Sequence, residues 1–431
     1  MGRSAGLRTI GAVVVIFLVT ACGQVNDGAI SAAQRPDIAT IAAGAATATA
    51  TAARLPASRA VPSPTSTMEV TLTANPTLLP DEPPPSGAER DFSTDFGTHS
   101  VPYSEILSGG PPKDGIPAID HPRFISVEQA DAWLKPQEPV ILFQVGDDAR
   151  AYPLQILVWH EIVNDTLSEV PVVVTFCPLC NTAIAFERTV DGQVLDFGTT
   201  GRLRFSNLVM YDRQTESWWQ QATGEAIAGE FTGRQLVFRP APIISWSDFK
   251  TAHPEGKVLS RETGYARSYG RNPYVGYDNV NQSPFLYVGP KTPGALAPMA
   301  RVVTVDLNGE AVAYPYDMLQ EVHVVNDEVG GVPIVVFWAP GTASALDTTA
   351  VATGRDVGAA NVFSRELDGR TLTFRLDGER ITDEQTGSEW GVLGQATSGE
   401  LQGSQLETVV SINHFWFSWA AFKPETRIYQ P

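Results

Sequence analysis

Basic residues are scarce in this sequence. Lys and Arg total 30, against 48 Asp and Glu, and the formal net charge is −18. The charge becomes two units more negative if an N-terminal leader containing Arg3 and Arg8 is removed. Such an acidic balance argues against binding to nucleic acid, whose phosphates it repels, and against electrostatic attraction to a membrane surface.

Several motifs that would indicate an enzyme class are also missing. The sequence contains neither a His-Glu-x-x-His zinc pair nor a glycine-rich loop that would cradle a phosphate. The apolar run at residues 10–19 is too short to cross a bilayer comfortably. The sequence therefore leaves open whether the protein is an enzyme.

The apolar run instead belongs to a leader. Residues 1–21 have the layout of a secretory signal peptide, with Arg3 and Arg8 ahead of the run. The ending Val19-Thr20-Ala21-Cys22 resembles the lipobox of bacterial lipoproteins, where cleavage precedes an acylated cysteine. This resemblance implies a lipid anchor at Cys22, at the outer face of the cytoplasmic membrane or in the periplasm of the cell envelope. The alternative is an ordinary signal peptide followed by a chance cysteine.

Aromatic residues are absent between Phe17 and Phe92. Ala, Thr, Pro and Ser dominate most of this stretch. Such a segment cannot bury enough apolar area to offset the entropy lost on ordering. The composition predicts a disordered tether over residues 22–95.

The rest of the sequence is long enough for two domains. Its aromatic, Gly and Pro content is typical of strands joined by tight turns. Apolar runs at residues 140–145, 183–186 and 207–211 predict strands. We expect a mainly β (α+β) fold of antiparallel sheets with a few short helices, one of them at residues 127–134.

Two parts of this sequence repeat each other. Arg150-Ala151-Tyr152-Pro153 is followed by Val163-Asn164-Asp165, and the same pattern returns at constant spacing in residues 312–315 and 325–327. Further matched pairs are Asp212 with Asp383, Thr215 with Thr386, Ser217 with Ser388 and Trp219 with Trp390. The pattern predicts a tandem duplication of two similar antiparallel β-rich units, the first at residues 96–295 and the second at residues 296–431.

The closest pair of cysteines ends a predicted buried strand. The β-branched run at residues 172–175 leads into Cys177-Pro178-Leu179-Cys180. The second unit has Ala339-Pro340 at the equivalent place, so the proline persists and both sulfurs are gone. A polar residue found in one unit only is a better candidate for function than a residue shared by both. The first unit is therefore predicted to carry the chemistry.

His160 also has no histidine counterpart in the second unit. If Asp165 pairs with Val170 across the predicted hairpin, His160 lies opposite Thr175 and diagonal to Cys177. Cross-strand diagonals are within reach of an imidazole and a thiolate. A slip of one residue would send His160 to the other face. The alternative is a hydrogen-bonded structural histidine.

Four ordered motifs carry a resemblance to a known family. The sequence resembles the bacterial family known as domain of unknown function 3179, from about Lys113 to the C-terminus. The resemblance implies no activity. The motifs are Asp114-Gly115-Ile116-Pro117, Trp159-His160-Glu161-Ile162-Val163-Asn164-Asp165, Cys177-Pro178-Leu179-Cys180 and Asn207-Leu208-Val209-Met210-Tyr211-Asp212-Arg213.

Three hypotheses for the cysteine pair remain open. Cys177, Cys180 and His160 could bind a soft metal ion, copper if Met210 joins them or zinc if Glu161 does. The pair could instead cycle between dithiol and disulfide. The third hypothesis is a structural disulfide.

The competing class of function is a non-enzymatic scaffold or ligand-binding lipoprotein. In that case the two cysteines would form the structural disulfide, and protein partners would be unknown. Arg202 and Arg213 are candidates for binding an anion near the corner, although arginines on an acidic protein are more often solvated or paired with carboxylates.

Overall fold

The computed structural model describes residues 77–431, which belong to one unit of the chain, Ser63–Pro431. These residues form a mainly β structure whose helices have at most seven residues. The predicted class, antiparallel sheets with short helices, is confirmed. The predicted signal peptide, Cys22 and most of the predicted tether lie outside the described residues.

Two hairpins and a helix build the part that carries the cysteine pair. Pro153 directly precedes the helix, where the first N–H groups have no intrahelical partner and the missing N–H of proline is tolerated. The elements, in order, are β3 (Pro139–Val145), β4 (Asp148–Pro153), α3 (Leu154–His160), β5 (Ile162–Leu167), β6 (Val170–Cys177), the 3-10 turn η2 (Pro178–Cys180) and β7 (Thr182–Glu187).

The elements up to residue 259 form three larger sheets, and strands β3 to β7 belong to two of them. Their strand orders are β14-β7-β6-β5, β15-β3-β4-β16-β2 and β1-β10-β11-β12-β13. The remaining elements up to residue 259 are α1 (Ala88–Asp91), η1 (Tyr103–Glu105), β1 (Ile106–Ser108), β2 (Phe124–Ser126), α2 (Val127–Asp131), β8 (Thr189–Val190), β9 (Gln193–Val194), β10 (Phe197–Arg204), β11 (Asn207–Asp212), β12 (Trp218–Gln220), β13 (Glu225–Ala228), β14 (Val237–Arg239), β15 (Ile243–Ser245), α4 (Trp246–Ala252) and β16 (Lys257–Leu259).

A second series of elements follows residue 300. Its main sheets have the orders β28-β17-β18-β29, β19-β20-β21 and β24-β25-β26-β27. The elements are β17 (Arg301–Leu307), β18 (Glu310–Pro315), α5 (Tyr316–Val322), β19 (Val324–Val329), β20 (Val332–Ala339), η3 (Val351–Thr353), β21 (Ala359–Ser364), β22 (Glu366–Leu367), β23 (Arg370–Thr371), β24 (Phe374–Asp377), β25 (Arg380–Asp383), β26 (Glu389–Trp390), β27 (Ala396–Ser398), β28 (Ser411–Phe415), α6 (Trp416–Ala420) and β29 (Arg427–Ile428).

The two series share a set of local hydrogen bonds around a tryptophan. The Asp212 carboxylate accepts from the backbone N–H and hydroxyl of Thr215 and from the indole N–H of Trp219, 2.9 Å away. The Asp383 carboxylate accepts from the indole of Trp390 at 3.0 Å and from the residue three positions after the aspartate in the same two ways. The residues matched by sequence therefore make the same local hydrogen bonds in both series.

A buried tyrosine also contacts an aspartate in both series. The Tyr152 hydroxyl donates to Asp165 at 2.6 Å, and Tyr314 donates to Asp327 at 2.8 Å. Arg150 adds two hydrogen bonds to Asp165, at 2.7 and 2.8 Å. The tyrosines of the Ala-Tyr-Pro repeats thus tie the first hairpin of each series to the second.

The predicted register of the β5–β6 hairpin was wrong by two residues. Asp165 lies opposite Val172, and not opposite Val170. The prediction used a four-residue turn, whereas the chain turns at Ser168 and Glu169 alone, both of which have positive φ angles. Two-residue turns of this kind match the twist of antiparallel strands, which explains why the shorter turn is preferred.

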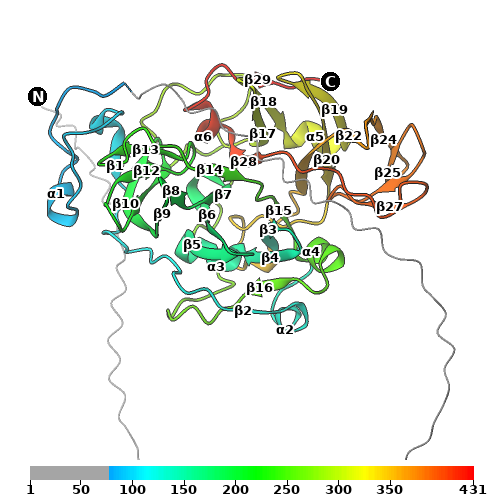
Figure 1. Ribbon diagram of the computed structural model, residues 1–431, viewed down its shortest axis with the longest axis horizontal. Coiled ribbons are helices and arrows are strands. Elements are labelled where there is room, and N and C mark those ends of the chain that lie inside the picture. The colour runs from blue at the N-terminus through cyan, green and yellow to red at the C-terminus, as the bar shows by residue number, and fades with distance from the viewer. Residues whose placement is uncertain (1–76) are drawn as a thin grey trace, which may run out of the picture. The chain divides into compact units, whose positions relative to one another are not determined.

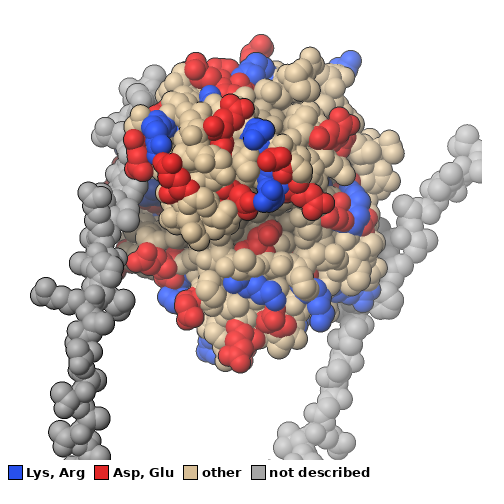
Figure 2. Space-filling model, turned by 90° about the vertical axis from the view of Figure 1, so that its right-hand side faces the viewer, with Lys and Arg blue, Asp and Glu red and all other residues tan. Residues whose placement is uncertain are grey.

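One hydrophobic cluster contains residues of both series. Its buried side chains come from β5, β6 and β7 and also from β17, β28 and α6, for example Val302 and Trp416. Strand β28 packs on β7, and Figure 1 shows β17, β18 and β28 beside the strands of the first series. Figure 2 shows acidic and basic side chains mixed over one face, with a hollow crossing it.

Two irregular stretches complete the described chain. Residues 77–95 fall inside the predicted tether, yet Ala88 and Phe92 are buried in a small cluster with Trp218, so folding begins before residue 96. Phe92 provides the apolar surface that the preceding residues lack. Residues 260–300 join the two series without a helix or strand. We call residues 261–300 the connecting segment.

Candidate functional site

The Cys-x-x-Cys pair forms a corner between two central strands. β6 ends at Cys177, and a single 3-10 turn leads through Cys180 to β7. The β-branched run of β6 is buried on both faces, as a central strand requires. Asn181 completes the corner in the left-handed region, with φ 52°.

Both sulfurs lie within the protein as free thiols. Cys177 is 2% exposed and Cys180 is 0% exposed. The Cys180 thiol donates to the carbonyl of Ser206 at 3.4 Å and accepts from the side-chain amide of Asn207 at 3.4 Å, while the Cys177 sulfur lies 4.0 Å from the same carbonyl. Burial, together with the neighbouring Cys180, raises the pKa of the Cys177 thiol well above its ordinary value.

The carbonyl of Ser206 belongs to the β10–β11 turn, whose two residues have unusual backbone angles. Arg204 pairs with Asn207, so the turn consists of Phe205 and Ser206, with φ angles of 52° and 66°. Turns with two positive φ angles normally use Asn-Gly or Gly-Gly, because side chains crowd the backbone in the left-handed region. The β5–β6 hairpin uses the same kind of turn at Ser168 and Glu169, so the turn at Ser206 is notable only because its carbonyl faces the sulfurs.

Glu161 is a buried titratable residue next to the end of β6. It ends α3 with φ 60°, and its carbonyl accepts from the N–H of Phe176 at 2.8 Å. Burial raises the pKa of its carboxyl to about 8, an effect that the hydroxyl of Tyr274 partly offsets. A negative charge on Glu161 in turn raises the pKa of Cys177, so the titration of the two groups is linked.

Two tyrosines of the connecting segment cover this cluster, and the sequence prediction missed them. The pKa of Tyr274 is raised by burial and by charge on Glu161 and Cys177, and that of Tyr277 by burial and by charge on both cysteines. Tyr277 also accepts a hydrogen bond from the backbone N–H of Phe285 at 3.1 Å. The segment is rich in tyrosine, but nothing in its sequence pattern indicates which element it covers.

His160 does not join the sulfurs. Its Nδ1 bonds to the carbonyl of Pro117 at 2.7 Å and its Nε2 to the hydroxyl of Tyr269 at 2.6 Å. Burial lowers the pKa of the imidazole to about 4, so the ring is neutral. In residues 77–431 no group of three or more His, Cys, Asp or Glu side chains is placed to hold a metal ion. The histidine thus has the hydrogen-bonded role that sequence left as the alternative.

The other candidate residues are placed as follows. Met210 is buried in β11 opposite Trp219. Arg202 donates to the carbonyl of Ser86 at 2.8 Å, and Arg213 pairs with Asp120. Both arginines are therefore already bonded within the protein, and neither is a free anion site.

A network of buried side-chain amides is hydrogen-bonded to Cys180. The Asn207 amide that bonds Cys180 also donates to Gln221 at 2.9 Å, and Gln221 donates to the Thr175 hydroxyl at 3.0 Å. The Asn207 side-chain oxygen accepts from Gln220 at 2.5 Å. These hydrogen bonds restrain the side-chain amide of Asn207, which donates to the Cys180 sulfur.

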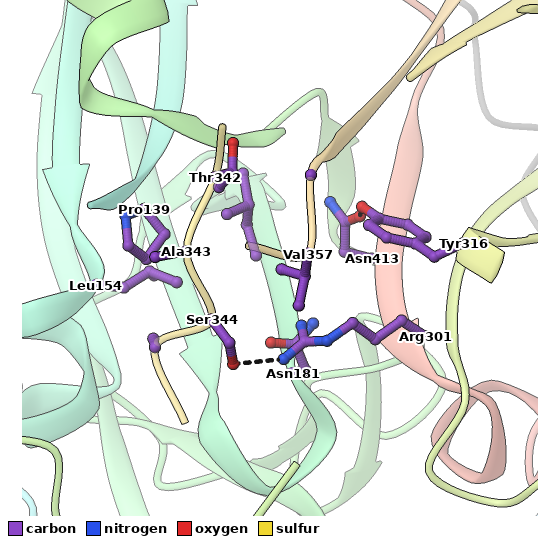
Figure 3. Close-up of a pocket in the computed structure, with 13 residues that line it drawn as sticks. Pro139, Leu154, Asn181, Arg301, Tyr316, Thr342, Ala343, Ser344, Val357 and Asn413 are labelled. Carbon is purple, nitrogen blue, oxygen red and sulfur yellow. Dashed lines mark hydrogen bonds between the residues drawn. The ribbon is translucent and has the colours of Figure 1, made fainter. Parts of the chain in front are cut away.

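A small pocket lies next to the corner and is lined by residues of both series. Figure 3 shows Asn181, the residue after Cys180, together with Arg301 and Thr342 in the pocket lining, and Arg301 donating to Ser344 at 2.7 Å. The Thr342 hydroxyl is buried there without a protein partner. The cavity volume is about 20 Å³. It has room for about one water molecule and not for an organic substrate.

The model of a family described as a protein of unknown function, DUF3179, matches residues 113–426. The chain belongs to the DUF3179 family. No curated protein and no solved structure matches this chain. The DUF3179 match includes the cysteine corner, Glu161, the connecting segment and the second series up to residue 426, and it confirms the family resemblance drawn from sequence.

The helices of this DUF3179 protein are short throughout the part that the structure describes. Among residues 77–431, no helix is both long enough and apolar enough to cross a bilayer.

Proposed function

We propose that Cys177 and Cys180 form a dithiol–disulfide redox centre in which Glu161 accepts and returns the thiol proton. The observation that carries the proposal is the buried carboxyl of Glu161, whose pKa is raised to about 8 and whose backbone carbonyl accepts a hydrogen bond from Phe176, the residue before Cys177. Titratable groups with strongly shifted pKa values concentrate at functional sites.

The chemistry needs such a base. A thiolate is the nucleophile in disulfide exchange, and the buried thiol of Cys177 holds its proton at neutral pH. A carboxyl with a pKa near the working pH is well suited to general base catalysis. An ordinary exposed glutamate would be too weak a base to take this proton.

The exchange consumes a disulfide from a second molecule. One cysteine loses its proton to Glu161 and attacks a sulfur of the substrate disulfide, so that a mixed disulfide forms and one substrate thiolate leaves and takes up a proton. The second cysteine then attacks its neighbour, closes the Cys177–Cys180 disulfide and releases the second substrate thiol. The protein loses two electrons and two protons, and the substrate gains both.

The metal hypothesis receives less support. A zinc site needs three or four protein ligands, and both ring nitrogens of His160 are bonded elsewhere. Copper or zinc binding stays a prediction that elemental analysis of the full chain, purified without chelator, will decide. Metal at one equivalent that is lost in Cys177→Ser and Cys180→Ser would replace the redox proposal.

Mass spectrometry tests the redox proposal directly. Trypsin releases residues 151–188 as one peptide, which contains both cysteines and becomes two hydrogens lighter when they form a disulfide. We expect oxidised glutathione to cause this change in the reduced full chain, at a rate that rises with pH toward about 8. Failure of the parent protein to form the disulfide would refute the proposal.

A pair of matched variants isolates the base. Glu161→Gln should slow disulfide formation by about a hundredfold at neutral pH, the usual contribution of a general base, and should abolish the rise near pH 8. Glu138→Gln is the control, because Glu138 is another buried carboxyl with a raised pKa, bonded to Gln155. Equal pH profiles for the two variants would exclude Glu161 as the base.

We further propose, from the sequence alone, that the protein is a lipoprotein of the cell envelope. The lipobox-like run ending in Cys22 supports an acylated N-terminus there. The long Ala-, Thr- and Pro-rich stretch after it supports a tether. The redox centre would then work in an oxidising compartment.

We also propose that the two series arose by tandem duplication, with the chemistry kept in the first. The support is the matched order of β3-β4-α3-β5-β6-β7 and β17-β18-α5-β19-β20-β21, together with the shared Tyr–Asp and Trp–Asp hydrogen bonds. At the place of Glu161 and Phe176 the second series has His323 and Trp338, whose rings pack edge to face. An experimental structure in which the two series fail to superpose would refute the duplication.

A further inference from the structure

The side-chain amide of Asn207 is directed at the sulfur of Cys180. Its Nδ2 donates to Cys180 Sγ at 3.4 Å. The carbonyl of Ser206 does not distinguish the two sulfurs in this way, because it faces both. An N–H group stabilises a thiolate more than a thiol, since hydrogen bonds to an ionised acceptor are stronger than those to a neutral one. The amide of Asn207 therefore favours negative charge on Cys180.

Neighbouring groups decide which end of the Asn207 amide faces the sulfur. Asn207 Oδ1 accepts from the backbone N–H of Ala222 at 3.0 Å, and a backbone N–H can only donate. The nitrogen must therefore point toward Cys180. Gln221 restrains it, because Gln221 Oε1 accepts from Asn207 Nδ2 at 2.9 Å while its own Nε2 donates to the carbonyl of Thr182 at 3.2 Å.

Cys177 has a different environment. Burial raises the pKa of its thiol, and Cys180 and a charge on Glu161 raise it further. The backbone N–H of Leu208 lowers this pKa, but by less than the other three influences together raise it. Cys177 therefore keeps its proton until a base removes it, which is the role proposed for Glu161.

The amides occur in the series that has the cysteines and are lacking in the other. Two residues after the matched tryptophans, the first series has Gln221 and the second has Val392. The β10–β11 hairpin carries Asn207, whereas the shorter β24–β25 hairpin, which ends at the matched aspartate, already turns at residues 378–379. No residue of the second hairpin corresponds to Asn207. The donor and the group that restrains it thus accompany the sulfurs, as expected of groups that serve the reaction and not the shared fold.

We propose that Asn207 is a catalytic residue that stabilises the thiolate of Cys180, and that Cys177 is the sulfur that forms the mixed disulfide with the substrate. This inference rests on the proposed function. Once the mixed disulfide has formed, the Cys180 thiolate attacks Cys177 Sγ. The bond between Cys177 and the substrate sulfur breaks, the Cys177–Cys180 bond forms, and the proton of Cys180 ends on the departing substrate sulfur.

The enclosure of the two sulfurs gives this order of attack. Cys180 is 0% exposed, and its sulfur lies 3.4 Å from both the Ser206 carbonyl and the Asn207 amide. Cys177 is 2% exposed, and its sulfur lies 4.0 Å from the same carbonyl. The first attack must reach a second molecule, whereas the second attack only has to reach the neighbouring cysteine. The more enclosed sulfur therefore suits the second attack.

Single-cysteine variants of the reduced full chain show which sulfur meets the substrate, with oxidised glutathione as the probe. In Cys180→Ser the mixed disulfide at Cys177 has no second thiol to resolve it, so one glutathione should stay bound. It should add at least about tenfold faster than to Cys180 in Cys177→Ser, because exchange rates depend on access to the sulfur. Mass spectrometry of the intact proteins measures both rates. Equal rates, or faster addition to Cys180, would overturn the assignment of the two sulfurs.

Asn207→Ala tests the donor in a protein that keeps both cysteines. Loss of the donor should slow the second attack by about tenfold, which corresponds to the difference in strength between a charge-assisted and a neutral hydrogen bond. The glutathione adduct should therefore accumulate before the disulfide closes, while its formation keeps the parent rate. Asn361→Ala is the matched control, because Asn361 is also buried and lies on β21 of the second series. This control should close its disulfide as the parent does.

A purely structural role for Asn207 predicts a different result. It would slow both steps together, or neither, and either outcome would overturn the role of Asn207, as would equal accumulation of the adduct in the control. Asn207→Asp, which keeps the shape of the side chain and puts an oxygen in place of the donor, is used if the alanine variant does not fold.

Failure of this inference is distinguishable from failure of the redox function. If the parent closes the Cys177–Cys180 disulfide and the Asn207 variants close it equally fast, the redox function stands and the role of Asn207 is refuted. If the parent forms neither adduct nor disulfide with oxidised glutathione, the redox function is refuted and this inference with it.

Discussion

The substitution Glu161→Gln should change how the stability of the protein depends on pH. Burial raises the pKa of this carboxyl from 4.5 to about 8. Between these values the folded protein holds a proton that the unfolded chain has lost. The stabilising effect of that proton is fully present below pH 4.5 and is lost as the pH rises through about 8.

The magnitude follows from the size of the shift. Each pH unit between the two pKa values lowers the free energy of unfolding by about 1.4 kcal/mol. The loss is therefore roughly 3 kcal/mol at pH 7 and roughly 4 kcal/mol at pH 8, relative to acid. Glutamine has the same shape, can still accept from Tyr274 and does not titrate, so the variant should not show this loss.

Two buried histidines act in the opposite direction. Burial lowers the pKa of His160 to about 4 and that of His414 to about 3, so both favour folding increasingly as the pH rises toward 6.5. Both histidines are present in the parent and in the variant, so their contributions to the free energy of unfolding cancel when the two proteins are compared. The difference in stability therefore isolates Glu161.

Urea denaturation from pH 5 to pH 8 measures this difference. The variant and parent should be closest in stability near pH 5, and the variant should gain on the parent by about 1.4 kcal/mol for each further pH unit. A constant difference over this range would refute the reasoning, because it would mean that the carboxyl titrates at its ordinary pKa and is not buried beside Cys177.

Three further predictions concern stability and attachment. Trp219→Phe and Trp390→Phe each remove an indole that donates to a buried carboxylate, and each should lower the free energy of unfolding by about 1.5–3 kcal/mol. Arg150→Met leaves a buried carboxylate without its arginine and should cost about 3–5 kcal/mol in urea denaturation, against about 1 kcal/mol or less for the exposed pair removed by Arg234→Met. Cys22→Ala should shift the protein from the membrane fraction to the soluble fraction or leave it uncleaved.

Each of these has a clear contrary result. A tryptophan variant in one series that costs nothing while the other is strongly destabilised would contradict the equivalence of the two motifs. Equal destabilisation by the two arginine variants would mean that burial does not decide the strength of the pair. A Cys22 variant that fractionates like the parent would place any anchor elsewhere.

Local features of the site could be predicted from sequence because they depend on neighbouring residues. The β-branched run before Cys177 predicts a buried strand, and Pro178 restricts the corner that follows. The repeated Ala-Tyr-Pro and Trp–Asp patterns predict similar local structures, since each makes its hydrogen bonds within a few residues or to the next hairpin. The mainly β class follows from the same alternation of short runs and turns.

The choice between His160 and Glu161 was made by tertiary structure. Glu161, at the end of α3, has a positive φ angle. Its residue type did not predict this angle, because glutamate rarely adopts a positive φ. At that turn the backbone carbonyl of Glu161 accepts from the N–H of Phe176, and the imidazole of His160 bonds to the carbonyl of Pro117. The two-residue turn at the end of the hairpin also set the register, which depends on the geometry of the turn as well as on the strand pattern.

Sequence by itself thus determined which residues are unusual in this protein: a Cys-x-x-Cys pair at the end of a buried strand, a repeat that lacks the pair, and a segment rich in tyrosine. Tertiary structure alone decided which of them meet. Ser206, Tyr274 and Tyr277 reach the sulfurs from segments about 25 to 100 residues away. Contacts over such separations depend on how sheets and loops pack together, and no local pattern of residues encodes them.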